Sequence, residues 1–391
     1  MAVDVNQTTQ RLEWLLSECV ARDASDVHLA AGVPPYWRMQ GQLAPEPGEA
    51  PLDAEQLETL GVYMAERSGR DRLGATGSLD GAITAPDGSR FRFNLFRRSG
   101  QLSIALRRLE DRFRTLADLG MPDSLYELCD LPDGLVIVAG PTGAGKSTTL
   151  ATLIDRVNQT RRGHIVTIED PIEYVHAPAA SLVNQRQIGT DARSFDEALV
   201  ASMRQDPDVI LVGEIRDLPT IRAAITAAET GHLVFTTVHA GDCVGAVERL
   251  VSVFPADEQT GTRRQLALVL RAIIAQHLLV ADGPADDMRG PKNADGLPVR
   301  RGRVVTSEVL ISTPATANLI ATAKSNQIYS VMESGGQFGM QTLEEDLARL
   351  WATGRISEHT ATSMARNPQV LRDRHAALRP GNGIRSRSLS R

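Results

Sequence analysis

Residues 135–147 read Leu135-Val-Ile-Val-Ala-Gly-Pro-Thr-Gly-Ala-Gly-Lys-Ser147. The first five residues form an uninterrupted apolar run, which is typical of a strand buried on both faces. The next eight match G-x-x-x-x-G-K-[ST], a loop whose backbone N–H groups cradle phosphates. A helix is predicted from Ser147, because apolar residues recur at helical spacing through Val157. Strand, glycine-rich loop and helix in this order predict an anion site at a helix N-terminus.

Lysine is rare in this chain, which makes its presence in the loop informative. Lysine occurs only at Lys146, Lys292 and Lys324, and the other basic residues are arginine. A compact ammonium reaches between two phosphates, whereas a planar guanidinium is a wider fork. We therefore expect ATP on this loop, with Mg²⁺ on the Ser147 hydroxyl. The expected ATP-binding residues are Gly140, Pro141, Thr142, Gly143, Ala144, Gly145, Lys146, Ser147 and Thr148.

Composition restricts the class of protein. A chain of 391 residues accommodates two or three domains. Its three cysteines are far apart in the sequence, which favours a reduced, cytosolic protein without structural zinc. No apolar run approaches the roughly 20 residues that span a bilayer, so we expect only peripheral membrane association. The net charge of −6 argues against a dominant nucleic-acid surface.

Before the loop, residues 1–111 predict a small α+β domain. Helices are expected at 10–22 and 52–68, and strands at 25–29, 33–43, 78–84, 90–96 and 102–109. Residues 112–120 are expected to form a linker.

After the linker, residues 121–365 alternate strands with helices, which predicts a parallel α/β sheet. Expected strands are 135–139, 164–168, 209–212, 233–238 and 304–310, and expected helices are 147–160, 194–205, 219–230, 263–279, 343–351 and 357–365. An irregular insertion is expected at 281–303, and residues 366–391 are expected to be a basic, disordered tail.

Polar side chains follow several predicted strands, and ligands of open α/β sheets bind outside the carboxyl ends of strands. Glu214 ends an apolar run in a Walker B arrangement, so we assign it to Mg²⁺. Glu169, after the neighbouring strand, is the expected base for the attacking water, although the two roles can be exchanged. His232 and His239 flank one strand, and we expect His239 to act in catalysis and His232 to bind ATP, with an ordinary core or surface role about equally open for both. A carboxylate in such a place can also simply cap the next helix.

Three longer motifs resemble a known family. Thr167-Ile-Glu-Asp-Pro-Ile-Glu173 is similar to its Asp box, residues 204–217 to its Walker B, and residues 226–239 to its His box. Residues 24–35 resemble the start of its PAS-like N-terminal domain. From about residue 12 to 357, the chain resembles the secretion and type IV pilus ATPases, nearest to their pilus retraction members.

The resemblance implies a RecA-like P-loop ATPase that assembles into a homo-hexamer. ATP would lie between subunits, with Arg92 and Arg107 of the small domain completing the site in trans. Hydrolysis would turn an inner-membrane platform protein of the PilC type so that pilins leave the filament. A PilU-like paralogue is a further expected partner, and the expected location is the cytoplasmic side of the inner membrane at the pilus base.

Departures from the family pattern keep other functions open. The family's charged Ala-Ile-Arg-Asn-Leu-Ile-Arg-Glu motif reads Ala315-Thr-Ala-Asn-Leu-Ile-Ala-Thr322 here. The alternatives are a pilus-assembly or type II secretion ATPase, a catalytically weak accessory subunit, and a nucleic-acid translocase that uses the basic tail. Assembly relatives usually carry a tetracysteine zinc motif, and this chain does not, which favours retraction.

Overall fold

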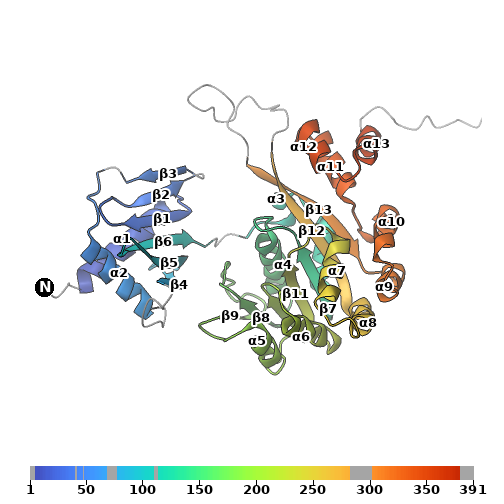
Figure 1. Cartoon of the computed structure of the whole chain (residues 1–391), viewed down its shortest axis with the longest axis horizontal. Helices are drawn as coiled ribbons and strands as arrows, with labels where there is room; N and C mark the ends of the chain where they lie inside the picture. Colours follow the sequence, from blue (N-terminus) through green and yellow to red (C-terminus); the bar gives the residue numbers. More distant parts are fainter. Residues whose placement is uncertain are drawn as a thin grey trace, which may run out of the picture. The chain divides into compact units, whose positions relative to one another are not determined.

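The computed structural model describes residues 5–39, 42–46, 48–67, 77–109, 113–281 and 302–378. The chain divides into two compact units (Figure 1). Unit 1 comprises Met1–Arg112, Asp170–Val175 and Arg186–Arg193. Unit 2 comprises Phe113–Glu169, His176–Gln185 and Ser194–Arg391.

Unit 1 is a six-stranded antiparallel sheet with two helices. The strand order is β3-β2-β1-β6-β5-β4. The strands are β1 Asp26–Ala30, β2 Tyr36–Met39, β3 Gln42–Pro45, β4 Ser78–Thr84, β5 Arg90–Arg98 and β6 Gln101–Arg108. The helices α1 Val5–Ala21 and α2 Ala54–Arg67 pack on the sheet. These elements correspond to the predicted ones, except that the expected strand at 33–43 is a hairpin of two strands, β2 and β3, and that α1 begins at Val5 rather than at residue 10.

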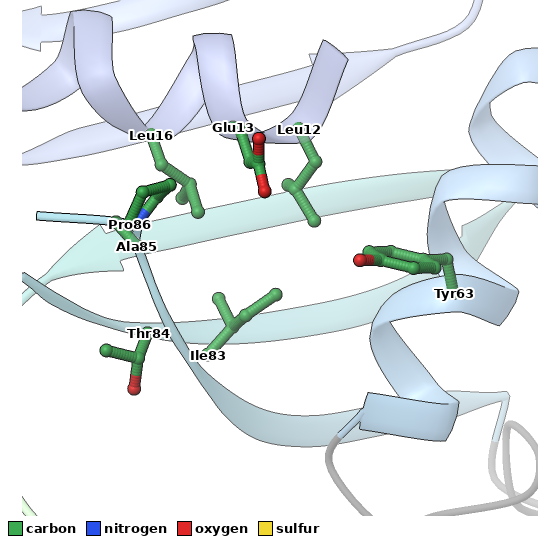
Figure 2. A pocket seen from close by; sticks show the side chains of 8 residues that line it. All are labelled: Leu12, Glu13, Leu16, Tyr63, Ile83, Thr84, Ala85 and Pro86. Atoms are coloured by element: carbon green, nitrogen blue, oxygen red, sulfur yellow. The ribbon is translucent and has the colours of Figure 1, made fainter. Parts of the chain in front are cut away.

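The period-2 pattern of β5 explains the core of unit 1. Phe91, Phe93 and Leu95 are fully buried, while the residues between them are partly exposed. A cavity of about 280 Å³ opens where α1 and α2 meet the end of β4. In Figure 2, Leu12, Glu13 and Leu16 reach it from α1 and Tyr63 from α2. It contains no residue of the phosphate loop, so it is not the predicted nucleotide site.

Unit 2 is built on a seven-stranded, mostly parallel sheet of order β13-β12-β7-β11-β10-β8-β9. Its strands are β7 Gly134–Ala139, β8 His164–Glu169, β9 Leu182–Gln187, β10 Val209–Val212, β11 Leu233–Val238, β12 Leu270–Val280 and β13 Arg303–Ile311. β12 and β13 are antiparallel, and β12, β7, β11, β10 and β8 run parallel. The predicted α/β fold class is confirmed.

The helices of unit 2 connect and cover these strands (Figure 1). They are α3 Leu116–Leu119, α4 Lys146–Thr160, α5 Phe195–Ser202, α6 Leu218–Glu229, α7 Cys243–Ser252, α8 Gln259–Val269, α9 Pro314–Ala321, α10 Ile328–Ser334, α11 Leu343–Ala352, α12 Glu358–Met364 and α13 Pro368–Leu378. Short 3₁₀ turns are η1 Asp123–Asp130, η2 Ser325–Gln327 and η3 Gly336–Phe338. The apolar stripe of α4 packs in one core with Val136 and Val138, which fixes the helix beside β7.

The prediction of one helix over 263–279 is wrong. The helix α8 ends at Val269, and the following eleven residues form β12. Periodicity cannot separate a buried helix from a buried strand in a continuous apolar run. The strand is favoured because it pairs with β7 on one side and β13 on the other.

The prediction of disorder from 366 onward is wrong for Pro368–Leu378, which form α13. Leu371 is fully buried, and His375 stacks on Trp351 with ring centroids 3.5 Å apart. Arg366 lies 2.6 Å from Glu308 and 3.5 Å from Asp242. These three residues are called the Arg366 cluster below. The composition of this segment resembled a disordered tail because its apolar anchors are few.

Other segments differ in smaller ways. The expected linker 112–120 carries α3, in which Leu116 is fully buried. The strand β9 and the helix α7 were not expected. Within the expected insertion 281–303, residues 282–301 lie outside the described residues, as do residues 379–391 of the expected tail.

Candidate nucleotide site

The phosphate loop joins β7 to α4 as the sequence predicts. Gly143 and Gly145 have φ of +78° and +89°, values that L-residues with a side chain rarely adopt. Gly145 is the N-cap of α4, and because it has no side-chain oxygen the first helical N–H groups remain available for an anion. The Lys146 ammonium donates to the carbonyl oxygens of Gly140 at 2.9 Å and Pro141 at 3.0 Å. Ser147 is exposed, so its hydroxyl is accessible to a cation.

The parallel register brings the predicted carboxylates to the same sheet edge as the loop. Ala139, the residue before the loop, pairs with Val238, which precedes His239. Ile168, which precedes Glu169, pairs with Val212, two residues before Glu214. The Gly213 N–H also donates to the carbonyl of Ile168 at 2.8 Å, which holds the ends of β8 and β10 together.

Glu214 lies among positively charged groups. Its Oε2 accepts from Arg216 Nη2 at 2.6 Å, and its Oε1 lies 2.9 Å from His239 Nε2 without hydrogen-bond alignment. Burial acts to raise the pKa of the Glu214 carboxyl, but Arg216, His239 and Lys146 together lower it below its ordinary value. Glu214 is therefore ionised at neutral pH and is suited to a cation, either directly or through water.

Glu169 has a different environment. Its side chain is buried, and Oε1 accepts from Thr167 Oγ1 at 2.7 Å and from Gln185 Nε2 at 3.2 Å. The contacts to Oε1 come from neutral donors that fix the position of the carboxylate without neutralising it. The sequence did not suggest Gln185, because β9 was not predicted and the two residues are sixteen positions apart.

Within one chain, His232 lies at the opposite end of β11 from the phosphate loop. It precedes β11, and its carbonyl accepts from the N–H of Gly134, the first residue of β7. Its Nδ1 lies 2.9 Å from the carbonyl of Ala227 at the end of α6. The six-residue strand β11 lies between it and His239, so the two residues are about 23 Å apart along the strand at roughly 3.3 Å per residue.

Arg92 and Arg107 belong to unit 1, where they are directly opposite each other on β5 and β6. Both are on the sheet face away from the buried Phe91 and Phe93, and their side chains are 43% and 66% exposed. Arg107 Nε lies 2.8 Å from Asp26 Oδ1, and Arg92 Nη2 lies 4.0 Å from Asp80 Oδ1. The Arg92–Asp80 pair is exposed on both sides and contributes little stability, so Arg92 can exchange its partner for a phosphate, whereas Arg107 is paired with the buried carboxylate of Asp26.

The residues at the edge fit ATP and Mg²⁺. The loop supplies helix-terminal N–H groups and an ammonium for phosphates. The Ser147 hydroxyl and the Glu214 carboxylate are oxygen ligands of the kind that a nucleotide-bound Mg²⁺ takes from a protein, the remainder being phosphates and water. Within the described residues, no cluster of three or more His, Cys, Asp or Glu side chains could hold a metal without a nucleotide.

Fold and loop together define the class of protein: a RecA-like P-loop NTPase with a small α+β unit. The chain belongs to the Type II/IV secretion system protein family, whose model matches residues 2–358.

Relatives within the family are similar over nearly the whole length. The chain is 41% identical to the type IV pilus retraction ATPase PilT of Pseudomonas aeruginosa, over 91% of this chain and 98% of the relative. It is 37% identical to the type IV pilus ATPase PilU of the same species, over 92% and 90%. A crystal structure of the pilus retraction motor PilT with bound ADP matches with a TM-score of 0.81 and 39% identity, covering 92% of this chain and 98% of that one.

Within the described residues, no helix is both long and apolar enough to cross a bilayer.

Proposed function

We propose that this chain is an ATP-hydrolysing motor that drives type IV pilus retraction as a hexameric ring. The observation that carries the proposal is the whole-length similarity to the pilus retraction ATPase PilT. The phosphate loop, Glu169, Glu214 and His239 at one sheet edge support it, because they are the groups that nucleotide hydrolysis needs.

In the binding step, phosphate oxygens replace carbonyl oxygens of the loop as hydrogen-bond acceptors. The Lys146 ammonium leaves the carbonyls of Gly140 and Pro141 for phosphate oxygens. Ser147 and Glu214 would hold Mg²⁺, which would supply positive charge to the phosphates when bound.

In the hydrolytic step, Glu169 orients the attacking water and accepts its proton. Thr167 and Gln185 support this role because they hold the carboxylate in one orientation. Exchange of the two glutamate roles is testable. If Glu214 serves Mg²⁺, Glu214→Gln raises the Mg²⁺ concentration needed for half-maximal turnover, whereas Glu169→Gln lowers turnover at an unchanged requirement.

Contacts beyond one chain complete the proposed mechanism. Arg92 and Arg107 reach the nucleotide of a neighbouring subunit and stabilise charge on the transferred phosphate, and His232 contributes from its own edge. The ring works at the cytoplasmic side of the inner membrane, on a platform protein of the PilC type. A PilU-like paralogue is a second proposed partner.

A catalytically weak accessory subunit is the alternative that a specific observation favours. The motif at 315–322 lacks the charges of the family pattern, and in α9 its Thr316 and Ile320 are fully buried. A neutral helix face cannot form the ion pairs with a charged partner that the charged family motif could form.

The pilus phenotype of a deletion strain tests the direction of the motor. Retraction predicts hyperpiliated cells that do not twitch, and restoration by the wild-type chain but not by Lys146→Ala. Bald cells would instead support pilus assembly. Restoration by Lys146→Ala would support the accessory role, because that role does not need hydrolysis by this chain.

A further inference from the structure

Gln276 lies beside the phosphate loop in β12, the strand that was predicted from the sequence to be part of a helix. In the pairing of β12 with β7, Ala275 is opposite Ala139. The residue that follows each of them therefore lies at the same level of the sheet, beside the phosphate loop. That places Gln276 against Gly140, the first glycine of the loop. The Gln276 side chain is fully buried.

The amide of Gln276 joins the loop to the first turn of α4. Its Nε2 donates to the carbonyl oxygen of Ala144 at 2.7 Å, and its Oε1 accepts from Thr149 Oγ1 at 2.9 Å. The orientation of the amide is determined, because a carbonyl oxygen can only accept a hydrogen bond. Both polar ends of this buried side chain are thus satisfied by the nucleotide-binding segment.

The loop is also packed closely against this residue. A Cβ at Gly140 would lie 2.5 Å from the backbone oxygen of Gln276, and a Cβ at Gly145 would lie 3.3 Å from its Nε2. The glycines of the motif therefore allow close approach to β12 as well as to a phosphate.

We propose that Gln276 is a positioning residue that holds the phosphate loop in its nucleotide-binding shape. The inference rests on the proposed nucleotide site. By binding the Ala144 carbonyl on the buried side, Gln276 keeps that oxygen away from the exposed side, where Ser147 lies and phosphates enter. A carbonyl turned toward a triphosphate would repel it. A loop fixed in advance also avoids the ordering cost on binding.

A purely structural role is the competing explanation. A buried amide that only completes the core would affect the melting temperature when changed, but not the affinity of folded protein for a nucleotide. A positioning role weakens affinity beyond the effect of lost stability. A broken buried hydrogen bond of this kind predicts a loss of about 10- to 100-fold.

The test measures ADP binding by calorimetry with Mg²⁺, and thermal unfolding, on the full chain. Gln276→Met keeps the size of the side chain and removes both bonds. Gln276→Glu keeps the acceptor for Thr149 and loses the donor to Ala144. Ile274→Val is the matched control, because Ile274 is fully buried in the same strand.

The proposal predicts that both Gln276 variants bind ADP at least 10-fold more weakly, whereas Ile274→Val lowers the melting temperature and binds like wild type. Folded Gln276 variants that bind within twofold of wild type would overturn the inference. If Gln276→Met does not unfold cooperatively, Gln276→Glu alone decides by the same criterion, with Thr149→Val as its partner from the other end of the bridge. Failure of the wild-type chain to bind ADP would overturn the proposed function instead.

Discussion

Glu214 and Glu308 are two carboxylates of unit 2, each 2.6 Å from an arginine, whose pKa values move in opposite directions. At the nucleotide edge, the Glu214 side chain is 18% exposed, and the effects of Arg216, His239 and Lys146 together outweigh burial and lower its pKa. In the Arg366 cluster, the Glu308 side chain is 2% exposed, and burial raises its pKa despite Arg366. Access to water and the number of nearby charges decide the direction.

The difference indicates two uses of a charged side chain. Glu214 remains ionised next to solvent, where it is available to a cation. Glu308 is committed to its neighbours, since it also accepts from the backbone N–H of Cys243 at 3.0 Å. We therefore expect substitutions at the nucleotide edge to change chemistry, and substitutions in the Arg366 cluster to change stability.

The largest expected effect separates these two uses. Glu214→Gln keeps the size of the side chain and removes its charge, so we expect ATP turnover to fall about 10³-fold, as for loss of a charged catalytic group. The matched change, Glu308→Gln, is expected to leave turnover of the folded protein within twofold. Steady-state phosphate release measures both. Equal losses would contradict the division of roles.

The second effect is the pH dependence of stability that His176 causes. His176 is buried, and its backbone N–H donates to the side chain of Gln185, which in turn donates to Glu169. Burial lowers the pKa of the His176 imidazole from 6.5 to about 4. Because the unfolded chain binds this proton more readily, His176 contributes stability that is full above pH 6.5 and is lost as the pH falls toward 4. The contribution is about 3 kcal/mol.

Urea unfolding at a series of pH values measures this effect. His176→Phe, which can keep the stacking on Phe113, is expected to flatten the fall in unfolding free energy between pH 6.5 and 4. The exposed His359→Phe is the control and is expected to leave the slope unchanged. An unchanged slope in His176→Phe would sink the prediction. Glu308 acts in the opposite sense, because its raised pKa gives stability that is lost as the pH rises through that value.

The third effect is on the Arg366 cluster. Arg366→Ala leaves the Glu308 carboxyl buried without its partner, which we expect to cost about 2 kcal/mol of unfolding free energy. Proton uptake by Glu308 limits the cost. Glu308→Gln in the same chain is expected to recover most of the loss.

A surface arginine on α13 provides the control for this prediction. Arg374 lies 3.3 Å from Glu345 with a 41% exposed side chain, and its replacement by Ala is expected to change stability by less than about 0.5 kcal/mol. Denaturant midpoints compare the two variants. If Arg366→Ala is as mild as Arg374→Ala, the cluster does not hold α13.

The smallest effect on stability is expected for Arg92, in unit 1. Arg92→Ala removes only a 4.0 Å contact with an exposed aspartate, so unfolding should change by less than about 0.5 kcal/mol. If Arg92 acts in trans, turnover nevertheless falls. Mixing this variant with the inactive Lys146→Ala chain then restores activity, because some sites receive Lys146 from one subunit and Arg92 from the other. No recovery on mixing would argue against a role in trans.

The nucleotide edge was predictable because its signals are local. An apolar run gives each of these strands, and the site residues follow the run closely: the phosphate loop begins directly after Ala139, and Glu214 lies two residues after Val212. Register then follows from parallel pairing, so the order of strands and helices alone predicts Glu169 and Glu214 at one edge.

The remaining features depend on contacts between distant residues. Gln276 and Thr149 are 127 positions apart, and only the assignment of β12 as a strand brings them together. His232 looked equivalent to His239 because both flank one strand, but the ends of a strand face opposite edges. Arg366 looked like part of a tail because its partners, Glu308 and Asp242, are far away in the sequence.

Phosphate release from ATP by the purified wild-type chain, beside Lys146→Ala, tests the central claim most directly. The account predicts Mg²⁺-dependent turnover by the wild type, and loss of that turnover in Lys146→Ala at an unchanged melting temperature. Wild-type turnover no higher than that of Lys146→Ala would contradict the account, because the edge that holds the phosphate loop, Glu169 and Glu214 would then not be a hydrolytic site.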